Sequence, residues 1–188
     1  MSFLDMHSLN LTVFYFLNGG AGYYPELDTL MLFVTNYIPY SMVLLVAGYM
    51  FWWYHHSSHI LSSTVERMIQ SIEFAVSLAA TWFIGSCIKV LVAYPRPFMT
   101  LPQSILLVPD QGGYSFPSMH TALVFAVAVT VMVHHRRLGI LLILLALLVG
   151  VSRIYIGVHY PIDVLGGIVL GYAIPWTMHH FFDKVRTQ

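Results

Sequence analysis

Five long apolar stretches constrain this chain more than any other feature of its sequence. They cover residues 27–54, 68–92, 117–133, 138–156 and 161–182. A helix needs about 20 mostly apolar residues to cross the hydrocarbon core of a bilayer. Only 9% of the 188 residues are charged, whereas soluble domains average about 25%. The sequence therefore predicts an all-α, polytopic transmembrane bundle with five or six spanning helices, forming a single domain over residues 1–188.

The first 20 residues differ from these stretches because polar side chains interrupt their apolar ones. This segment is too short and too polar to span a bilayer comfortably. We expect it to form an amphipathic helix that lies at the membrane interface. The alternative is a short additional spanning helix. Within the first long stretch, Pro39 predicts a kink.

The lysine and arginine residues fall into two groups when the predicted helices are counted. Five lie on one side of the bundle: Arg67, Arg136, Arg137, Lys184 and Arg186. The positive-inside rule makes that side the cytoplasm. The other three lie at the opposite face, where such charges are disfavoured: Lys89, Arg96 and Arg153. The formal net charge is zero, so no basic field favours nucleic acid as a partner.

One segment places chemically active side chains in the most apolar half of the chain. It contains Arg153, His159 and Asp163, with Pro161 between the last two. Proline is favoured in the first turn of a helix, which would put Asp163 close to His159. An arginine fork binds phosphate, and a carboxylate beside a histidine fixes its tautomer. A single histidine is more often structural than catalytic, so the interpretation depends on which other residues converge here.

Two further segments reach the same face of the predicted bundle. Lys89 and Arg96 end the second apolar stretch, and Pro117 to His120 open the third. The three cations face only two local carboxylates, Asp110 and Asp163, so the missing negative charge indicates an anionic ligand. If Pro117 is the first helical residue, the Ser118, Met119 and His120 amides are unpaired. They would then form an anion site at the helix start.

No set of metal ligands is apparent in the sequence. The only cysteine is Cys87. His55, His56 and His59 lack a cysteine or carboxylate nearby, so we expect them in a solvated loop. Glu73 lies near the start of the second stretch, where the headgroups can solvate it. We therefore expect metal-free chemistry without a cofactor.

The three segments together resemble the signature of the type 2 phosphatidic acid phosphatase (PAP2) family. That signature is Lys-x6-Arg-Pro, Pro-Ser-x-His and Ser-Arg-x5-His-x3-Asp, and all three parts occur in order between Lys89 and Asp163. The resemblance implies that the backbone amides from Ser118 to His120 hold the phosphate together with five residues: Lys89, Arg96, Ser118, Met119 and Arg153. It further implies that His159 is the nucleophile, Asp163 orients it and His120 protonates the leaving group. Met119 stands where the family usually has glycine.

Within the family, the small size and the segments around Arg96 and Ser118 look most like bacterial undecaprenyl-diphosphate phosphatases. The resemblance implies a lipid phosphatase in a bacterial inner membrane, with an extracytoplasmic active site and a phosphohistidine intermediate. Its partners would be the bilayer and a lipid phosphate substrate. Phosphatidylglycerophosphate, phosphatidate and lipid A phosphate stay open as substrates, as does transfer of the phosphoryl group to a second lipid. The alternative from another functional class is an ion-coupled transporter. The sequence gives no indication of oligomeric state.

Overall fold

The computed structural model describes residues 3–56, 62–109 and 112–186, and these ranges contain helices but no strand. The helices are α1 (Phe3–Asn18), α2 (Pro25–His56), α3 (Ser62–Val92), α4 (Pro97–Thr100), α5 (Met119–His134), α6 (Arg136–Tyr155) and α7 (Pro161–Arg186). Four of them, α2, α3, α6 and α7, are long and apolar enough to cross a membrane. The prediction of an all-α transmembrane bundle is confirmed.

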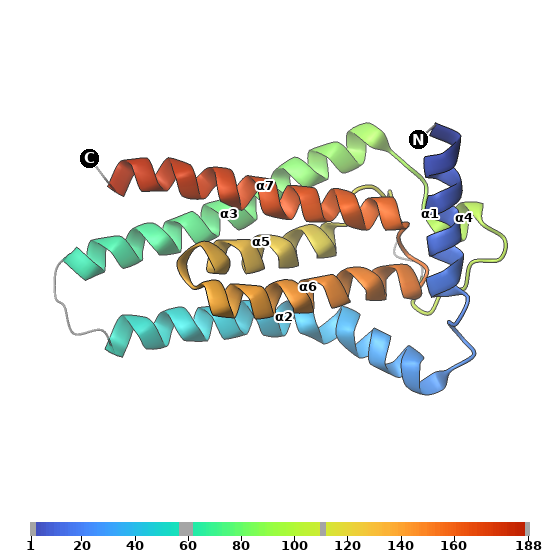
Figure 1. Ribbon diagram of the computed structural model, residues 1–188, viewed down its shortest axis with the longest axis horizontal. Helices are drawn as coiled ribbons and strands as arrows, with labels where there is room; N and C mark the ends of the chain where they lie inside the picture. The colour runs from blue at the N-terminus through green and yellow to red at the C-terminus, as the bar shows by residue number, and fades with distance from the viewer. Residues whose placement is uncertain (1–2, 57–61, 110–111, 187–188) are drawn as a thin grey trace.

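Helix α5 forms the centre of the bundle. It packs against α3, α6 and α7, and Figure 1 shows it enclosed between these longer helices. Ten of its side chains, from Thr121 to Val131, are buried. With 16 residues, α5 is about 24 Å long, shorter than the roughly 30 Å hydrocarbon core. Because its neighbours surround it, this central helix need not reach both membrane surfaces.

Small residues on α7 allow the close contact between α7 and α5. A Cβ atom on Gly167 would lie 2.6 Å from the Ser118 carbonyl oxygen, and one on Gly171 would lie 2.3 Å from that of Ala122. Any larger residue would push the two helices apart. This contact brings the start of α7 beside the start of α5.

The outer faces of the long helices are apolar. Large hydrophobic side chains are exposed along each of them, including Leu44, Phe83, Leu144 and Val169. Water would disfavour such a surface, whereas lipid tails solvate it. Helices pair most of their backbone groups internally, as a bilayer requires.

The two groups of cations lie at opposite ends of the bundle. Arg67 lies near the start of α3, Arg136 at the tight α5–α6 connection and Lys184 near the end of α7, and these elements meet at one end (Figure 1). The segments containing Lys89, Arg96 and Arg153 lie at the other end. The predicted separation of charge along the bundle is therefore present in the fold.

Helix α1 crosses the second of these ends instead of running along the bundle (Figure 1). Its last residue, Asn18, is buried and donates its side-chain amide to the carbonyls of Ile105 and Tyr155, each at 2.8 Å. The Asn18 side-chain oxygen accepts from the Ile105 N–H, also at 2.8 Å. The crosswise path agrees with an interfacial helix and not with a further spanning helix. Helix α2 contains Pro39 and bends in its first half, as expected (Figure 1).

Candidate active site

The connection between α6 and α7 is buried along its whole length, from Ser152 to Tyr160. Gly157 makes this path possible because its φ is +83° and a Cβ atom there would lie 2.2 Å from the Ile105 carbonyl oxygen. Only glycine adopts that conformation without strain. The turn sends the chain back so that His159 follows directly, inside the protein.

His159 and Asp163 form a buried pair. The His159 Nδ1 atom lies 3.3 Å from Asp163 Oδ2, and α7 begins at Pro161 with Asp163 in its first turn, as the sequence predicts. The same carboxylate oxygen accepts from the Tyr160 N–H at 2.8 Å and from the Ser115 hydroxyl. An imidazole that donates its Nδ1–H to this carboxylate keeps a lone pair on Nε2. That nitrogen is then the one able to attack.

Burial keeps His159 uncharged. Desolvation lowers its pKa to about 4, and the hydrogen bond to Asp163 offsets only part of that effect. A histidine with such a pKa is neutral at pH 7. Neutrality is what a nucleophilic imidazole requires, because protonated Nε2 has no lone pair.

Arg153 is anchored inside the bundle. Its side chain is almost fully buried near the end of α6, and its Nη1 donates to the Thr35 hydroxyl of α2 at 2.8 Å. A charge at this depth is costly and usually marks a functional site in a membrane protein. The bond to Thr35 fixes the direction of the guanidinium.

Lys89 and Arg96 both bind the segment that precedes α5. The Lys89 ammonium donates to the carbonyls of Tyr114 and Ser115 at 2.8 and 3.1 Å. Arg96 donates through Nε to the Gly113 carbonyl at 3.4 Å. Arg96 is also the N-cap residue of the short helix α4, although its side chain makes no capping hydrogen bond. The two cations therefore hold residues 113–115 against the end of α3.

The structure brings the predicted charged groups together. Lys89, Arg96 and Arg153 each lie within electrostatic range of His120, and Arg96 and Arg153 also act on His159. Of the two carboxylates expected nearby, Asp163 lies in this cluster, and Asp110 lies outside the described residues. A cluster of three cations around one buried carboxylate has the charge to hold a phosphate.

The start of α5 differs from the expectation in one respect. Pro117 is not helical, and Ser118 is the N-cap of a helix that begins at Met119. The Ser118 N–H donates to the Asp163 backbone carbonyl at 3.0 Å, so the prediction that this amide is unpaired was wrong. The Ser118 hydroxyl, which accepts from Thr121 at 3.0 Å, caps none of the following amides. The Met119 and His120 amides remain the candidates at this helix start.

The Met119 side chain packs against Gly85 of α3. A Cβ atom on Gly85 of α3 would lie 2.6 Å from the Met119 sulfur, so the thioether fills the space above that glycine. Because Gly85 has no side chain, there is room for the side chain of Met119.

Two residues of the site were missed by the sequence interpretation. Ser115 binds the Asp163 carboxylate, and Thr35 binds Arg153. Ser115 lies three residues before Ser118, inside a segment that already resembled the family, but no spacing rule joined it to Asp163. Thr35 lies within an apolar helix, and no sequence pattern indicated that it contacts Arg153.

An apolar pocket opens beside the buried pair. It is lined by Val92, Tyr94, Phe116 and Ile162 and reaches Asp163. Val92 and Ile162 are also exposed on the outer surface of α3 and α7. The pocket therefore joins the site to the exposed apolar surface at the ends of these helices.

Comparison with known proteins places this arrangement in a family. The PAP2 superfamily model matches residues 70–187, which include all of the clustered side chains except Thr35. The chain is 32% identical over 168 residues to the Bacillus licheniformis bacitracin transport permease protein BcrC, covering 89% of this chain and 78% of that one. It is 30% identical over 180 residues to the Bacillus subtilis undecaprenyl-diphosphatase BcrC, covering 95% and 86%.

A solved structure has the same fold. The PAP2-type phosphatidylglycerolphosphate phosphatase from Bacillus subtilis superposes with a TM-score of 0.70 at 21% identity, covering 96% of this chain and 88% of that one. The transmembrane fold and the matched motifs lead to the same assignment, and the chain belongs to the PAP2 superfamily of membrane lipid phosphatases.

Proposed function

We propose that this protein hydrolyses undecaprenyl diphosphate to undecaprenyl phosphate through a phosphohistidine on His159. The observation that supports this most is the convergence of Lys89, Arg96 and Arg153 on a buried His159–Asp163 pair. The cations bind and neutralise the terminal phosphate, while Asp163 aims the neutral imidazole at phosphorus. Positioning and charge stabilisation of this kind supply most of the catalysis in phosphoryl transfer.

In the first step, the His159 Nε2 lone pair forms a bond to the terminal phosphorus. The bond from that phosphorus to the bridging oxygen breaks, and its electron pair leaves with the lipid phosphate. His120, when protonated, donates its proton to the departing oxygen. Asp163 stabilises the positive charge that develops on the His159 ring.

In the second step, water attacks the phosphohistidine. His120, now neutral, accepts the proton of the water as its oxygen bonds to phosphorus. The phosphorus–nitrogen bond breaks, the electron pair returns to His159 Nε2, and inorganic phosphate leaves the cationic cluster. The enzyme is then ready for another lipid.

Two observations favour a lipid diphosphate with a long apolar tail. The chain covers most of a relative named as an undecaprenyl-diphosphatase. The pocket lined by Val92, Phe116 and Ile162 gives the tail an apolar path from the bilayer to Asp163. Phosphatidylglycerophosphate, phosphatidate and lipid A phosphate would enter by the same path, so they are the competing substrates.

A panel of lipid phosphates in detergent micelles tests the substrate. Phosphate release should be fastest from undecaprenyl diphosphate, with kcat/KM at least about tenfold above that for the other three. A preference for phosphatidylglycerophosphate would reject the proposed substrate while keeping the chemistry. Adding a second lipid as acceptor distinguishes transfer from hydrolysis, because transfer would lower the free phosphate per lipid consumed.

We further propose that the chemical step needs no metal ion, since Lys89, Arg96 and Arg153 supply the positive charge that a metal would otherwise provide. Initial rates in excess EDTA should equal those without it, and vanadate, which mimics pentacoordinate phosphorus, should inhibit. An initial rate that chelation abolishes and a divalent ion restores would contradict this.

We propose that the protein lies in a bacterial inner membrane and that its active site is on the face opposite the cytoplasm. The argument is the positive-inside rule applied to the end containing Arg67, Arg136 and Lys184. In a Cys87→Ser background, a membrane-impermeant thiol reagent added to intact cells should label a Gln103→Cys variant and not an Arg137→Cys variant. The reverse pattern would invert the orientation.

A further inference from the structure

Glu73 is buried completely, although the sequence suggested that headgroups would solvate it. Its carboxylate contacts two histidines from other helices. The His179 Nδ1 atom of α7 lies 2.9 Å from Oε1, and the His134 Nε2 atom at the end of α5 lies 3.3 Å from Oε2. Three helices thus each contribute one ligand-type side chain to one point.

The geometry of this cluster suits a metal ion. The three ligand atoms lie within 4.8 Å of one another. Zinc bonds to histidine nitrogen and carboxylate oxygen at roughly 2.0–2.2 Å, which in a tetrahedron places neighbouring ligand atoms roughly 3.3–3.6 Å apart. Of the two nitrogen–oxygen separations, the 3.3 Å between His134 and Oε2 equals the lower end of that range, and the 2.9 Å between His179 and Oε1 is shorter.

An ordinary hydrogen-bonded network accounts for this cluster less well. His179 is aligned for a hydrogen bond with Glu73, but the His134 Nε2 atom is buried without a hydrogen-bond partner among the described residues. It nevertheless lies next to the carboxylate. A cation shared by nitrogen and oxygen explains a short contact that lacks hydrogen-bond alignment.

We propose that Glu73, His134 and His179 bind a divalent transition-metal ion, with zinc fitting the two-histidine, one-carboxylate set best. The ion would connect α3, α5 and α7. His134 and the proposed general acid His120 lie at opposite ends of α5, 14 residues apart, or about 21 Å. The ion is therefore structural and takes no part in phosphoryl transfer.

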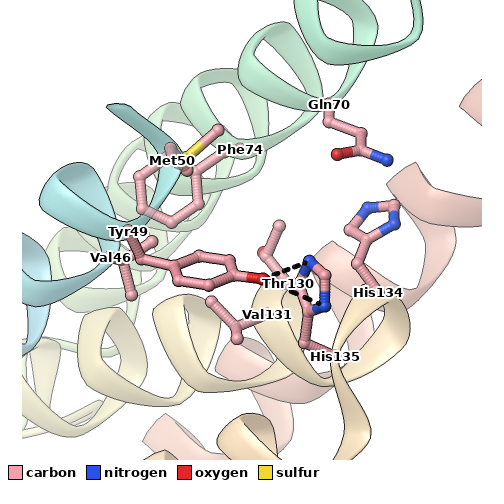
Figure 2. Close-up of a pocket in the computed structure, with 9 residues that line it drawn as sticks. All are labelled: Val46, Tyr49, Met50, Gln70, Phe74, Thr130, Val131, His134 and His135. Atoms are coloured by element: carbon pink, nitrogen blue, oxygen red, sulfur yellow. Dashed lines mark hydrogen bonds between the residues drawn. The ribbon is translucent and has the colours of Figure 1, made fainter. Parts of the chain in front are cut away.

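A neighbouring cavity gives the ion room for a fourth ligand. Gln70, one helical turn before Glu73, lines this cavity together with His134, His135 and Tyr49. Figure 2 shows the Gln70 amide on the side of the cavity nearest the His134 ring, and the Tyr49 hydroxyl directed at His135. Water held by the Gln70 amide would complete the tetrahedron.

Zinc binding by the full-length, untagged protein in detergent tests the proposal. After chelator treatment and removal of the chelator, one zinc ion should bind per chain in a titration against a competing chromophoric chelator. His134→Gln, His179→Gln and Glu73→Gln should each weaken binding by at least about 100-fold, the upper end of the cost of losing even an outer-shell partner. Cobalt bound in place of zinc should show the visible absorption of a tetrahedral site, and each variant should lose it.

His180→Gln is the matched control because His180 is the exposed neighbour of His179 and bonds to the Trp176 carbonyl. It should bind zinc like the wild type. A triple variant of His55, His56 and His59 to Gln should also retain the ion. Absence of stoichiometric zinc in the wild type would overturn the proposal. The proposal would also be overturned if the triple variant lost zinc binding while His134→Gln kept it. Circular dichroism and gel filtration exclude misfolding as the cause of a loss.

Discussion

The two ends of the bundle each bury a carboxylate beside histidine, but the surroundings of the two carboxylates differ. At one end, a single oxygen of Asp163 accepts from Ser115, Tyr160 and one histidine. At the other end, each oxygen of Glu73 has its own imidazole. The first arrangement holds one ring in one orientation. In the second arrangement, the ligand atoms of Glu73, His134 and His179 surround one point.

The same residue types are proposed to serve different chemistry at the two ends. Arg153 and Arg96 act on the ring that Asp163 contacts, so an anion that binds there would meet positive charge and the proposed nucleophile together. At the Glu73 end, the carboxylate and two nitrogens offer lone pairs, which attract a cation.

Replacing His120 should have a large effect that depends on the leaving group. A phosphate monoester expels an alkoxide, which needs a proton, whereas a lipid diphosphate expels a stabilised lipid phosphate. General acid catalysis is worth roughly 10²–10⁴-fold where it is needed. In single-turnover measurements, His120→Ala should therefore slow phosphohistidine formation by that factor with phosphatidate and far less with undecaprenyl diphosphate. Equal slowing on both lipids would reject the assignment of His120 as general acid.

Removing the Arg153 charge should be the next largest effect. A charge-assisted hydrogen bond is worth about 1.5–3 kcal/mol, so Arg153→Ala should lower kcat/KM by roughly tenfold or more. Arg137→Ala, an exposed residue at the opposite end, is the control and should change little. Thr35→Val removes the anchor but keeps the guanidinium, so its effect should be smaller. Equal effects for Arg153→Ala and Arg137→Ala would argue against the cationic cluster as the phosphate site.

Ser115→Ala tests the smallest of these effects. Its hydroxyl positions Asp163, and one intramolecular hydrogen bond contributes roughly 0.5–1.5 kcal/mol. We expect kcat to fall roughly two- to tenfold, with KM unchanged because the three cations stay in place. Steady-state kinetics on undecaprenyl diphosphate separate the two constants. A rise in KM with constant kcat would instead mean that Ser115 helps to bind the lipid.

At the His159 end of the bundle, the sequence predicted which residues meet, because they follow a local pattern in the chain. His159 and Asp163 are four residues apart, and Pro161 between them indicates the helix start that brings them together. The apolar stretches likewise predicted the long helices and the separation of the cations into two groups at opposite ends. These features depend on spacing along one chain segment, which a sequence displays directly.

What the sequence missed depends on contacts between distant segments. Glu73 and His179 are 106 residues apart, and no periodicity relates them. Ser115 lies 48 residues before the Asp163 that it binds. The start of α5 was misplaced by two residues because the Ser118 N–H bonds to the Asp163 backbone carbonyl, a partner supplied by another helix. Such pairs form only after α7 has packed against the rest of the bundle.

Trapping the covalent intermediate tests the central proposal most directly. Undecaprenyl diphosphate labelled with ³²P in its terminal phosphate is mixed with excess enzyme and quenched in alkali within the first turnover. We predict labelled protein that is stable to base and labile to acid, as a phosphohistidine is, with the label on the peptide containing His159. The label should be absent in His159→Ala and present in His180→Ala. Label on another residue, or rapid labelling of His159→Ala, would contradict the account.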